Sequence, residues 1–144
     1  MDSQSGSPSV SATGRPARRV LIVDDSPQVR QELRTLLPLA GNIDIAGEAA
    51  DGLEALRMAK ALRPDVILLD LQMPVMDGYE AARQIKAACP SCRVVALTVH
   101  ADPVSESRAA QAGVDAFLVK GASVESLVEA LSATASDPGG LEPR

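Results

Sequence analysis

The chain has 144 residues, the length of a single domain that can bury a sizeable core. Hydrophobic residues make up 46% of it, but with one Phe, one Tyr and no Trp the core must be filled by Val, Leu, Ile and Ala. The net charge of -5 excludes a basic footprint for nucleic acid, and no apolar run is long enough to cross a bilayer.

Both ends of the sequence are predicted to be tails outside the folded domain. Residues 1–17 are rich in Ser, Gly and Pro and lack the apolar stretch of a secretory signal, so we expect them to be disordered. Residues 137–144 contain a further Pro and Gly cluster and are expected to form a flexible tail. The domain is therefore predicted to span residues 18–136, and we expect it in the cytoplasm.

Strand-like apolar runs alternate with helical patterns along the whole domain. Strands are expected at residues 20–23, 43–49, 65–71, 93–99 and 115–120. Helices are expected at residues 26–40, 51–63, 77–89, 102–113 and 123–135. The strands are continuous apolar runs, which indicates a parallel sheet covered on both faces. Right-handed crossovers then make the fold class α/β, a doubly wound sandwich.

The helices carry recognisable starts and apolar faces. Ser26, Asp77 and Asp102 are expected to cap the helices that follow them, because their side-chain oxygens can accept a hydrogen bond from the first turn. The apolar faces of the first two helices are expected to contain Val29, Leu33, Leu36, Leu37, Leu53, Leu56 and Leu62.

Polar and charged side chains follow the strands at their carboxyl ends. The first strand ends at Asp24 and Asp25, the third at Asp70, the fourth at Thr98 and the fifth at Lys120. In an open α/β sheet the ligand crevice lies outside these ends. The sequence therefore predicts three carboxylates, one hydroxyl and one ammonium at a single edge of the sheet.

This set of groups indicates magnesium-assisted phosphoryl chemistry. Three neighbouring carboxylates repel one another, and a hard divalent cation such as Mg²⁺ removes that penalty. One carboxylate can then act as a nucleophile toward phosphorus, with Lys120 and the Thr98 hydroxyl facing the developing charge. Asp70 is the expected nucleophile, because it lies on the central strand and precedes a turn marked by Pro74 and Gly78.

Four segments together resemble the response-regulator receiver domain of bacterial two-component signalling. They are the Asp24-Asp25 pair, "LLDLQMPVMDG" at 68–78, "LTVHAD" at 97–102 and "AFLVKGAS" at 116–123. The resemblance runs from about residue 19 to residue 135, and "KGAS", "LTVH" and "GEAADGLEAL" bring it closest to receivers of NarL/LuxR-type regulators. It implies a flavodoxin-like (βα)₅ fold with a five-stranded parallel sheet in the order 2-1-3-4-5.

The resemblance implies a metal site and a phosphorylation site. Asp70 matches the phospho-acceptor aspartate. Asp25 and Asp70 would bind Mg²⁺ directly, Asp24 mainly through water, and the backbone carbonyl of Gln72 would complete the protein ligands.

The resemblance also implies a switch and a set of partners. Thr98 matches the threonine that bonds a phosphoryl oxygen, Lys120 the lysine that pairs with the phosphoryl group, and Phe117 the switch aromatic. The donor would be a sensor histidine kinase, a histidine phosphotransfer protein or a small donor such as acetyl phosphate. The domain would hydrolyse its own aspartyl phosphate without being a conventional enzyme, and a phosphorylation-dependent dimer is compatible with this family.

Two features depart from the family's pattern. Lys120 is followed by Gly121, where many receivers have a Pro with a cis bond. After Lys120 there is room for one helix and a tail, so we expect this chain to lack a DNA-binding arm. It would be either a stand-alone receiver or a receiver fragment of a DNA-binding regulator, with its output protein or domain unknown.

Other classes of protein fit the sequence less well. A phosphatase of the haloacid dehalogenase kind needs a second acid two residues after the nucleophile, where this chain has Gln72. A flavodoxin-like FMN binder needs a hydroxyl-rich loop after the first strand, where this chain has carboxylates. An interaction module that has lost phosphorylation would not need the complete set of acids, Thr98 and Lys120.

Two further residue signals are interpreted as having no catalytic role. Cys89 and Cys92 form a C-x-x-C pair, which we expect to be incidental loop cysteines rather than a redox dithiol or half of a zinc site. His100, two residues after Thr98, is expected to lie at the rim of the pocket.

Overall fold

The computed structural model describes residues 16–73, 75–99 and 102–133. Residues 137–144 and nearly all of the expected N-terminal tail lie outside the described residues, as do Pro74 and His100. Within the described part of the chain, none of the helices has the length and apolar character needed to span a bilayer.

Five strands and five helices alternate along the chain. The strands are β1 (Arg18–Val23), β2 (Ile43–Ala49), β3 (Val66–Asp70), β4 (Arg93–Thr98) and β5 (Ala116–Val119). The helices are α1 (Pro27–Ala40), α2 (Gly52–Leu62), α3 (Gly78–Ala88), α4 (Pro103–Gln111) and α5 (Val124–Ser132). All strand pairs are parallel, and their order is β2-β1-β3-β4-β5. The predicted fold class and strand order are therefore confirmed.

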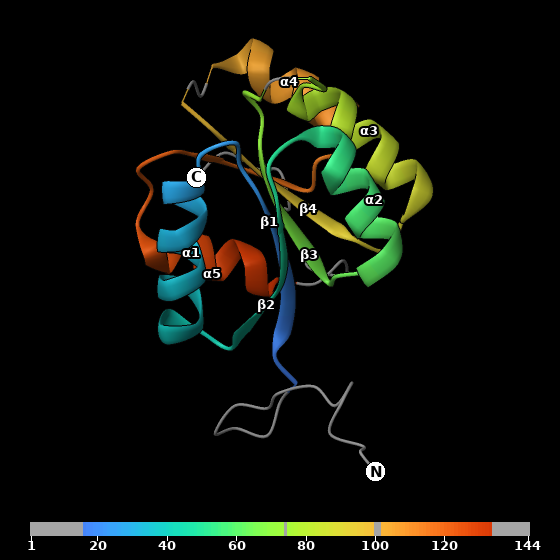
Figure 1. The fold of residues 1–144 in the computed structure, drawn as a ribbon. Coiled ribbons are helices and arrows are strands. Elements are labelled where there is room, and N and C mark those ends of the chain that lie inside the picture. Colours follow the sequence, from blue (N-terminus) through green and yellow to red (C-terminus); the bar gives the residue numbers. More distant parts are fainter. Residues whose placement is uncertain (1–15, 74, 100–101, 134–144) are drawn as a thin grey trace.

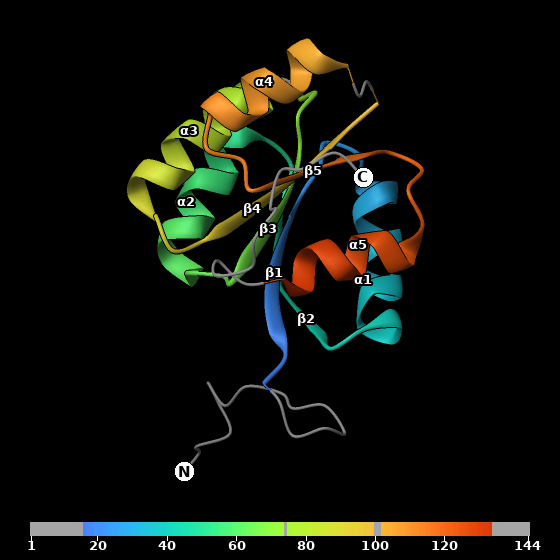
Figure 2. The same ribbon diagram turned by 180° about the vertical axis from the view of Figure 1, so that it is seen from behind.

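The sheet lies between two layers of helices. Helices α1 and α5 cover one face, and α2, α3 and α4 cover the other (Figures 1 and 2). Side chains of β1 alternate between the two resulting cores, with Leu21 and Val23 in one and Val20 and Ile22 in the other. Because each central strand is buried on both faces, its sequence has to be a continuous apolar run.

Each helix starts at a capping side chain. Ser26, Asp51, Asp77, Asp102 and Ser123 accept a hydrogen bond from an amide of the first turn of α1, α2, α3, α4 and α5. Such a cap stabilises a helix by about 1 kcal/mol. The three predicted caps are confirmed, and all five helices start on the side of the sheet where the strands end.

Two leucines expected on apolar helix faces are exposed. Leu36 is 49% exposed and Leu53 is 53% exposed. Helix α2 buries Gly52, Ala55 and Ala59 instead. At about 100° per residue, Leu53 lies on the side of α2 opposite Ala55, so both side chains cannot face the core. The sequence pattern favoured the larger side chains, whereas the packing uses the smaller ones.

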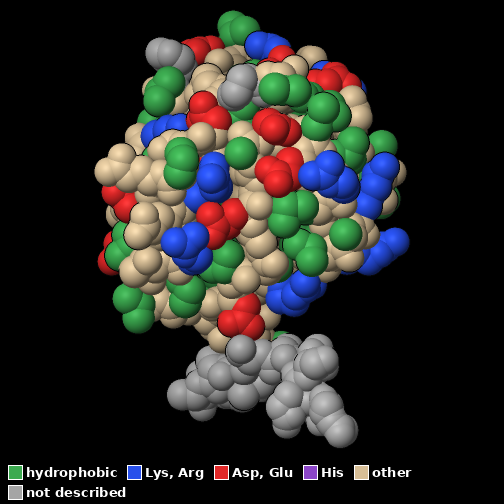
Figure 3. All heavy atoms as spheres, in the orientation of Figure 1, with side chains coloured by type: hydrophobic (Ala, Val, Ile, Leu, Met, Phe, Trp, Pro, Cys, Tyr) green, Lys and Arg blue, Asp and Glu red, His purple; other side chains and the backbone are tan. Residues whose placement is uncertain are grey.

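The surface mixes charges of both signs. On the face drawn in Figure 3, basic and acidic side chains are interspersed, and the basic ones do not merge into one patch. Helix α4 is tied to α3 by a cation–π contact, in which the Arg108 guanidinium carbon lies 3.8 Å from the centroid of the Tyr79 ring.

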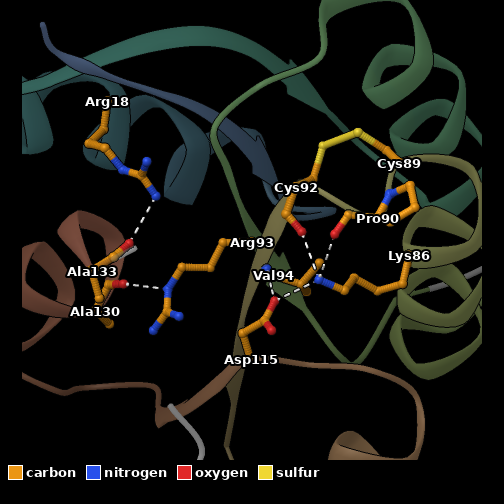
Figure 4. A network of polar contacts seen from close by, with 10 residues as sticks. All are labelled: Arg18, Lys86, Cys89, Pro90, Cys92, Arg93, Val94, Asp115, Ala130 and Ala133. Carbon is orange, nitrogen blue, oxygen red and sulfur yellow. Dashed lines mark hydrogen bonds and ion pairs between the residues drawn. A yellow bond between two sulfur atoms is a disulfide. The ribbon is translucent and has the colours of Figure 1, made fainter. Parts of the chain in front are cut away.

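Two arginines at the amino edge of the sheet hold the end of α5 (Figure 4). Arg18 donates to the carbonyls of Leu131 and Ala133 at 3.2 and 2.9 Å, and Arg93 donates to the carbonyl of Ala130 at 3.1 Å. The last carbonyls of a helix have no partner within it, and cationic donors there are favourable. The helix ends at Ser132 and Ala133 is extended, whereas residues 134 and 135 of the predicted helix lie outside the described residues.

The expectation that Cys89 and Cys92 are incidental loop cysteines was wrong. They are joined by a disulfide, and both are buried in the core between the sheet and helices α2, α3 and α4. The turn after α3 brings them together, because the Cys92 amide donates to the Cys89 carbonyl at 3.0 Å. Their Cα atoms are 5.6 Å apart, inside the usual range for a disulfide.

Helix α1 offers a matched test of the packing. Leu37 is fully buried against the sheet and α5, whereas its neighbour Leu36 is exposed. We expect Leu37→Ala to lower the free energy of unfolding by about 2–5 kcal/mol, because it leaves a cavity. Leu36→Ala should change it by no more than about 0.5 kcal/mol. Urea unfolding followed by circular dichroism measures both, and equal losses would contradict the described orientation of α1.

Candidate functional site

The strand register brings the ends of β1, β3 and β4 to one level. Val23 pairs with Leu69, and Asp70 pairs with Leu97. Asp24 follows Val23 directly, and its amide donates to the Ala49 carbonyl at 3.1 Å. The first carboxylates after β1 and at the end of β3 are therefore neighbours at the carboxyl edge of the sheet, as the sequence predicted.

Three aspartates form an acidic cluster at this edge. Asp24, Asp25 and Asp70 each offer a carboxylate oxygen, and these oxygens lie within 4.8 Å of one another. Asp24 and Asp70 are each only 2% exposed, whereas Asp25 is exposed. Carboxylates at this separation repel one another, and a cation close to them removes that repulsion.

Lys120 supplies one cation to the cluster. Its Nζ lies 3.1 Å from Asp70 Oδ2 and 3.6 Å from Asp24 Oδ2. The backbone amide of Lys120 donates to the Thr98 carbonyl at 2.7 Å, which fixes the start of this side chain against the end of β4. One positive charge thus faces three carboxylates, so a net negative charge is left in the pocket.

The environment of Asp70 and Lys120 shifts both pKa values upward. Burial raises the pKa of Asp70, and the charge of Asp24 adds to this, whereas hydrogen bonds from the Gln72 amide and Lys120 oppose it. Burial alone would lower the pKa of Lys120, but its hydrogen bond to Asp70 and the charges of Asp24 and Asp70 outweigh that effect. The raised pKa of Asp70 therefore reflects burial first, and the raised pKa of Lys120 reflects its two carboxylate neighbours.

One oxygen of the cluster lacks a hydrogen-bond donor. Asp24 Oδ1 accepts from the Ser26 amide at 2.9 Å, but the buried Asp24 Oδ2 has no partner within hydrogen-bond distance, and its ion pair with Lys120 Nζ is 3.6 Å long. A buried acceptor without a donor is costly, and coordination of a cation removes the cost. Two buried carboxylates and one exposed carboxylate are hard oxygen donors of the kind that a divalent cation such as Mg²⁺ prefers. The donor set therefore fits the metal that the sequence implied.

Thr98 and Gln72 meet beside the nucleophile expected from the sequence. Thr98 is fully buried, and its Oγ1 accepts a hydrogen bond from Gln72 Nε2 at 3.0 Å. The amide of Gln72 also donates to Asp70 Oδ1 at 3.0 Å. The sequence interpretation used only the carbonyl of Gln72 and missed this side-chain contact, because a glutamine after a strand carries no distinctive signal.

Phe117 lies near Thr98 but does not contact the acidic cluster by any described interaction. It is half-buried on β5, where it pairs with Ala96, two residues before Thr98 on the neighbouring strand. Its side chain packs against the core on the α2, α3 and α4 side. The structure therefore places the expected switch pair on adjacent strands.

A glycine is required where α3 begins. A Cβ atom on Gly78 would lie 2.4 Å from Leu71 Cα and 2.6 Å from the Asp70 carbonyl oxygen, closer than real contacts allow. The Gly78 amide donates to the Leu71 carbonyl at 3.1 Å, which closes the turn that follows β3. The glycine that marked a turn in the sequence thus holds α3 against the strand that carries Asp70.

The fold and the site together define a doubly wound α/β domain with an acidic pocket at the carboxyl edge of its sheet and a lysine facing it. The chain belongs to the response regulator receiver domain family, whose model matches residues 20–132.

Relatives and solved structures support this membership. The chain is 35% identical over 113 residues to the transcriptional regulatory protein LnrK of Bacillus subtilis (strain 168), covering 78% of this chain and 51% of that protein. It is 38% identical over 125 residues to the response regulator protein VraR of Staphylococcus aureus (strain Mu3 / ATCC 700698), covering 87% of this chain and 60% of VraR. The chain thus spans little more than half the length of these relatives.

A solved structure shows the same fold. The signal receiver domain of the putative response regulator NarL from Mycobacterium tuberculosis superposes with a TM-score of 0.75 at 36% identity. The match covers 80% of this chain and 93% of that one. The expected similarity to NarL/LuxR-type receivers is confirmed.

The raised pKa of Asp70 predicts how stability depends on pH without metal. The folded protein binds the Asp70 proton more tightly than the unfolded chain, so this contribution to stability is full below pH 3.8 and is lost as the pH rises through the raised pKa. Asp70→Asn cannot ionise. Relative to wild type, its free energy of unfolding in EDTA should therefore rise between pH 3.8 and pH 7.

Urea unfolding across this pH range measures the effect. Asp44→Asn, which removes a carboxylate from β2 outside the acidic cluster, is the matched control and should not gain stability relative to wild type as the pH rises. An Asp70→Asn difference that stays constant with pH would contradict the environment described for Asp70.

Proposed function

We propose that this domain is a phosphorylation-activated signalling switch that accepts a phosphoryl group on Asp70. The observation that carries the proposal is the contact between Lys120 and Asp70 inside a cluster of three aspartates. A buried carboxylate with an ammonium 3.1 Å away has the charge arrangement that suits attack on a phosphoryl group. Membership of the receiver family supports the same conclusion.

The metal site belongs to this proposal. Asp25 and Asp70 would bind Mg²⁺ directly, Asp24 mainly through water, and the Gln72 carbonyl would add a fourth protein ligand. The buried Asp24 Oδ2 without a donor and the exposure of Asp25 support a cation that enters from solvent. When bound, Mg²⁺ would supply the positive charge that lets carboxylates and phosphoryl oxygens approach one another.

In the proposed transfer, a carboxylate oxygen of Asp70 attacks the phosphorus of the donor. A P–O bond to Asp70 forms while the bond from phosphorus to the leaving group breaks, and the electron pair departs with an imidazole or an acetate. Lys120 neutralises charge on the phosphoryl oxygens throughout. Water later hydrolyses the aspartyl phosphate and restores Asp70, so the domain catalyses changes only to itself and is not a conventional enzyme.

The signal would leave the site through Thr98 and Phe117. A phosphoryl oxygen on Asp70 would accept a hydrogen bond from the Thr98 hydroxyl, and the space that Thr98 leaves would be filled by the Phe117 ring. Their positions on adjacent strands and the packing of Phe117 toward the α4 side support this route. Phosphorylation would shift the equilibrium between the two arrangements of Thr98 and Phe117. The size of that shift equals the difference between the interaction free energies of the phosphoryl group with the two arrangements.

The partners are proposed from the family. A sensor histidine kinase or a histidine phosphotransfer protein would be the physiological donor, and the location would be the cytoplasm. The relatives named above include a transcriptional regulatory protein and extend well beyond the matched region. An output domain or a separate output protein would therefore respond to the phosphorylation state of the domain. A phosphorylation-dependent dimer would be one such response.

Incubation with acetyl phosphate and Mg²⁺ tests the nucleophile. We expect wild type to gain one phosphoryl group and Asp70→Asn to gain none, because the amide cannot attack phosphorus. Asp44→Asn should be labelled like wild type, and EDTA should abolish labelling. Intact-protein mass spectrometry measures all of these states, and equal labelling of wild type and Asp70→Asn would rule out Asp70 as the acceptor.

The same reaction tests the metal ligands. Asp25→Ala should need a much higher Mg²⁺ concentration for half-maximal labelling, because it removes a direct ligand. Glu32→Ala removes the same charge from the exposed face of α1. Salt screens the attraction between an exposed carboxylate and Mg²⁺, so this variant should behave like wild type.

The switch is tested with beryllium fluoride, which mimics the phosphoryl group in the presence of Mg²⁺. We expect it to shift amide NMR signals of α4, β5 and α5 in wild type. Thr98→Ala should still bind the mimic but lose most of the shifts at a distance from Asp70, because the coupling hydroxyl is gone. If this variant responds as fully as wild type, the signal leaves the site by another route.

A further inference from the structure

The Cys89–Cys92 disulfide lies at the edge of the sheet opposite the acidic cluster. Cys89 caps the end of α3, and Cys92 directly precedes Arg93 at the start of β4 (Figure 4). The two cysteines are 2% and 1% exposed, whereas Pro90 and Ser91 between them are exposed. The turn thus exposes Pro90 and Ser91 to solvent and buries its sulfur atoms in the core.

Lys86 holds this turn from the last part of α3. Its Nζ donates to the Cys92 carbonyl at 2.9 Å and to the Pro90 carbonyl at 3.4 Å. The same nitrogen forms an ion pair with Asp115 Oδ2 at 3.0 Å (Figure 4). One ammonium group therefore makes contacts on both sides of Ser91 and connects the turn to the residue before β5.

Asp115 anchors Lys86 to the sheet. Asp115 Oδ2 also accepts from the Val94 amide at 2.8 Å, and the Asp115 amide donates to the Val94 carbonyl at 2.8 Å. These two bonds lie directly before the β4–β5 pairing, which begins at Val95 and Ala116. The turn that contains the disulfide is thus connected through Lys86 and Asp115 to the sheet.

We infer that Cys89 and Cys92 form a reversible thiol–disulfide site that reacts with low-molecular-weight thiols and disulfides, and that Lys86 controls access to it. In reduction, a thiolate of a dithiol attacks one sulfur and the Cys89–Cys92 bond breaks, which gives a mixed disulfide. The second thiolate of the dithiol then displaces the cysteine. Two electrons and two protons pass to the protein, which becomes a dithiol, and the reductant becomes a cyclic disulfide.

Access requires local opening of the turn. The attacking sulfur must approach the disulfide along the line of its bond, and buried sulfur atoms cannot be approached in this way. Opening exposes the sulfur atoms only if the Pro90 and Cys92 carbonyls leave Lys86. The rate of reduction is then set by how often these contacts break, as in other local opening reactions. This site is separate from phosphoryl transfer and does not depend on it.

Reduction kinetics with dithiothreitol test the role of Lys86. We expect reduction of Lys86→Met to be at least about tenfold faster than that of wild type, because the methionine keeps the apolar stem but cannot hold the carbonyls; about tenfold corresponds to about 1.4 kcal/mol in the opening equilibrium. Lys60→Met removes the same charge from an exposed position on α2 and should match wild type. Alkylation after quenching, followed by mass spectrometry, counts the reduced molecules.

Whether Lys86→Met is reduced faster or more slowly than wild type distinguishes two roles of Lys86, control of access to the disulfide and attraction of the anionic reductant. The reductant reacts as an anion, so loss of a nearby positive charge would by itself slow the reaction. Unchanged or slower reduction of Lys86→Met would overturn the proposed role of Lys86.

Reversibility is tested on wild type without any variant. After reduction and removal of the dithiol, glutathione disulfide should restore a protein in which neither cysteine is alkylated under denaturing conditions. Oxidised wild type should also unfold at a higher temperature than the reduced form, whereas Cys89→Ser/Cys92→Ser should not respond to dithiothreitol. Full alkylation of both cysteines after this oxidation would overturn the site itself.

Discussion

The central physical constraint on this structure is the burial of two carboxylates at the ends of its central strands, β1 and β3. Asp24 and Asp70 are almost fully buried, and burying an unpaired charge in a protein interior is costly. The Lys120 ammonium and the backbone amides of Ser26 and Gln72 offset part of that cost, but Asp24 Oδ2 has no donor closer than the Lys120 ammonium at 3.6 Å. One ammonium faces several carboxylates in this pocket, so a bound cation would lower the remaining repulsion.

The two edges of the sheet have different chemistry. At the carboxyl edge, acids, Thr98 and Lys120 converge because parallel strands all end there. At the amino edge, Arg18, Arg93 and Lys86 donate mainly to backbone carbonyls and fasten the end of α5 and the turn after α3. At the carboxyl edge the side chains contact one another, so a change of charge there can rearrange them. Strand β4 connects these two ends of the sheet, because it begins directly after the disulfide turn and ends at Thr98.

Similarity to known receivers bears on the fold and on the family, and the site has to be argued from this chain. The chain spans little more than half the length of the matched relatives, so what those proteins regulate is not carried over to it. The contacts among Asp70, Lys120, Gln72 and Thr98, by contrast, are features of this sequence. They give the proposed switch a physical basis that does not rest on the relatives' names.

The sequence by itself determined the fold class and the residues at the carboxyl edge, because apolar runs and strand ends are local patterns, whereas the strand order followed from the resemblance to receiver domains. Only the tertiary structure decided what depends on distances between separate elements. In the tertiary structure Leu53 is exposed and Ala55 is buried, and Cys89 and Cys92 form a disulfide. The carbonyls at the end of α5 accept hydrogen bonds from Arg18 of β1 and Arg93 of β4. It also revealed the hydrogen bond from Gln72 to Thr98, since contacts between side chains of different elements are set by packing and not by spacing along the chain.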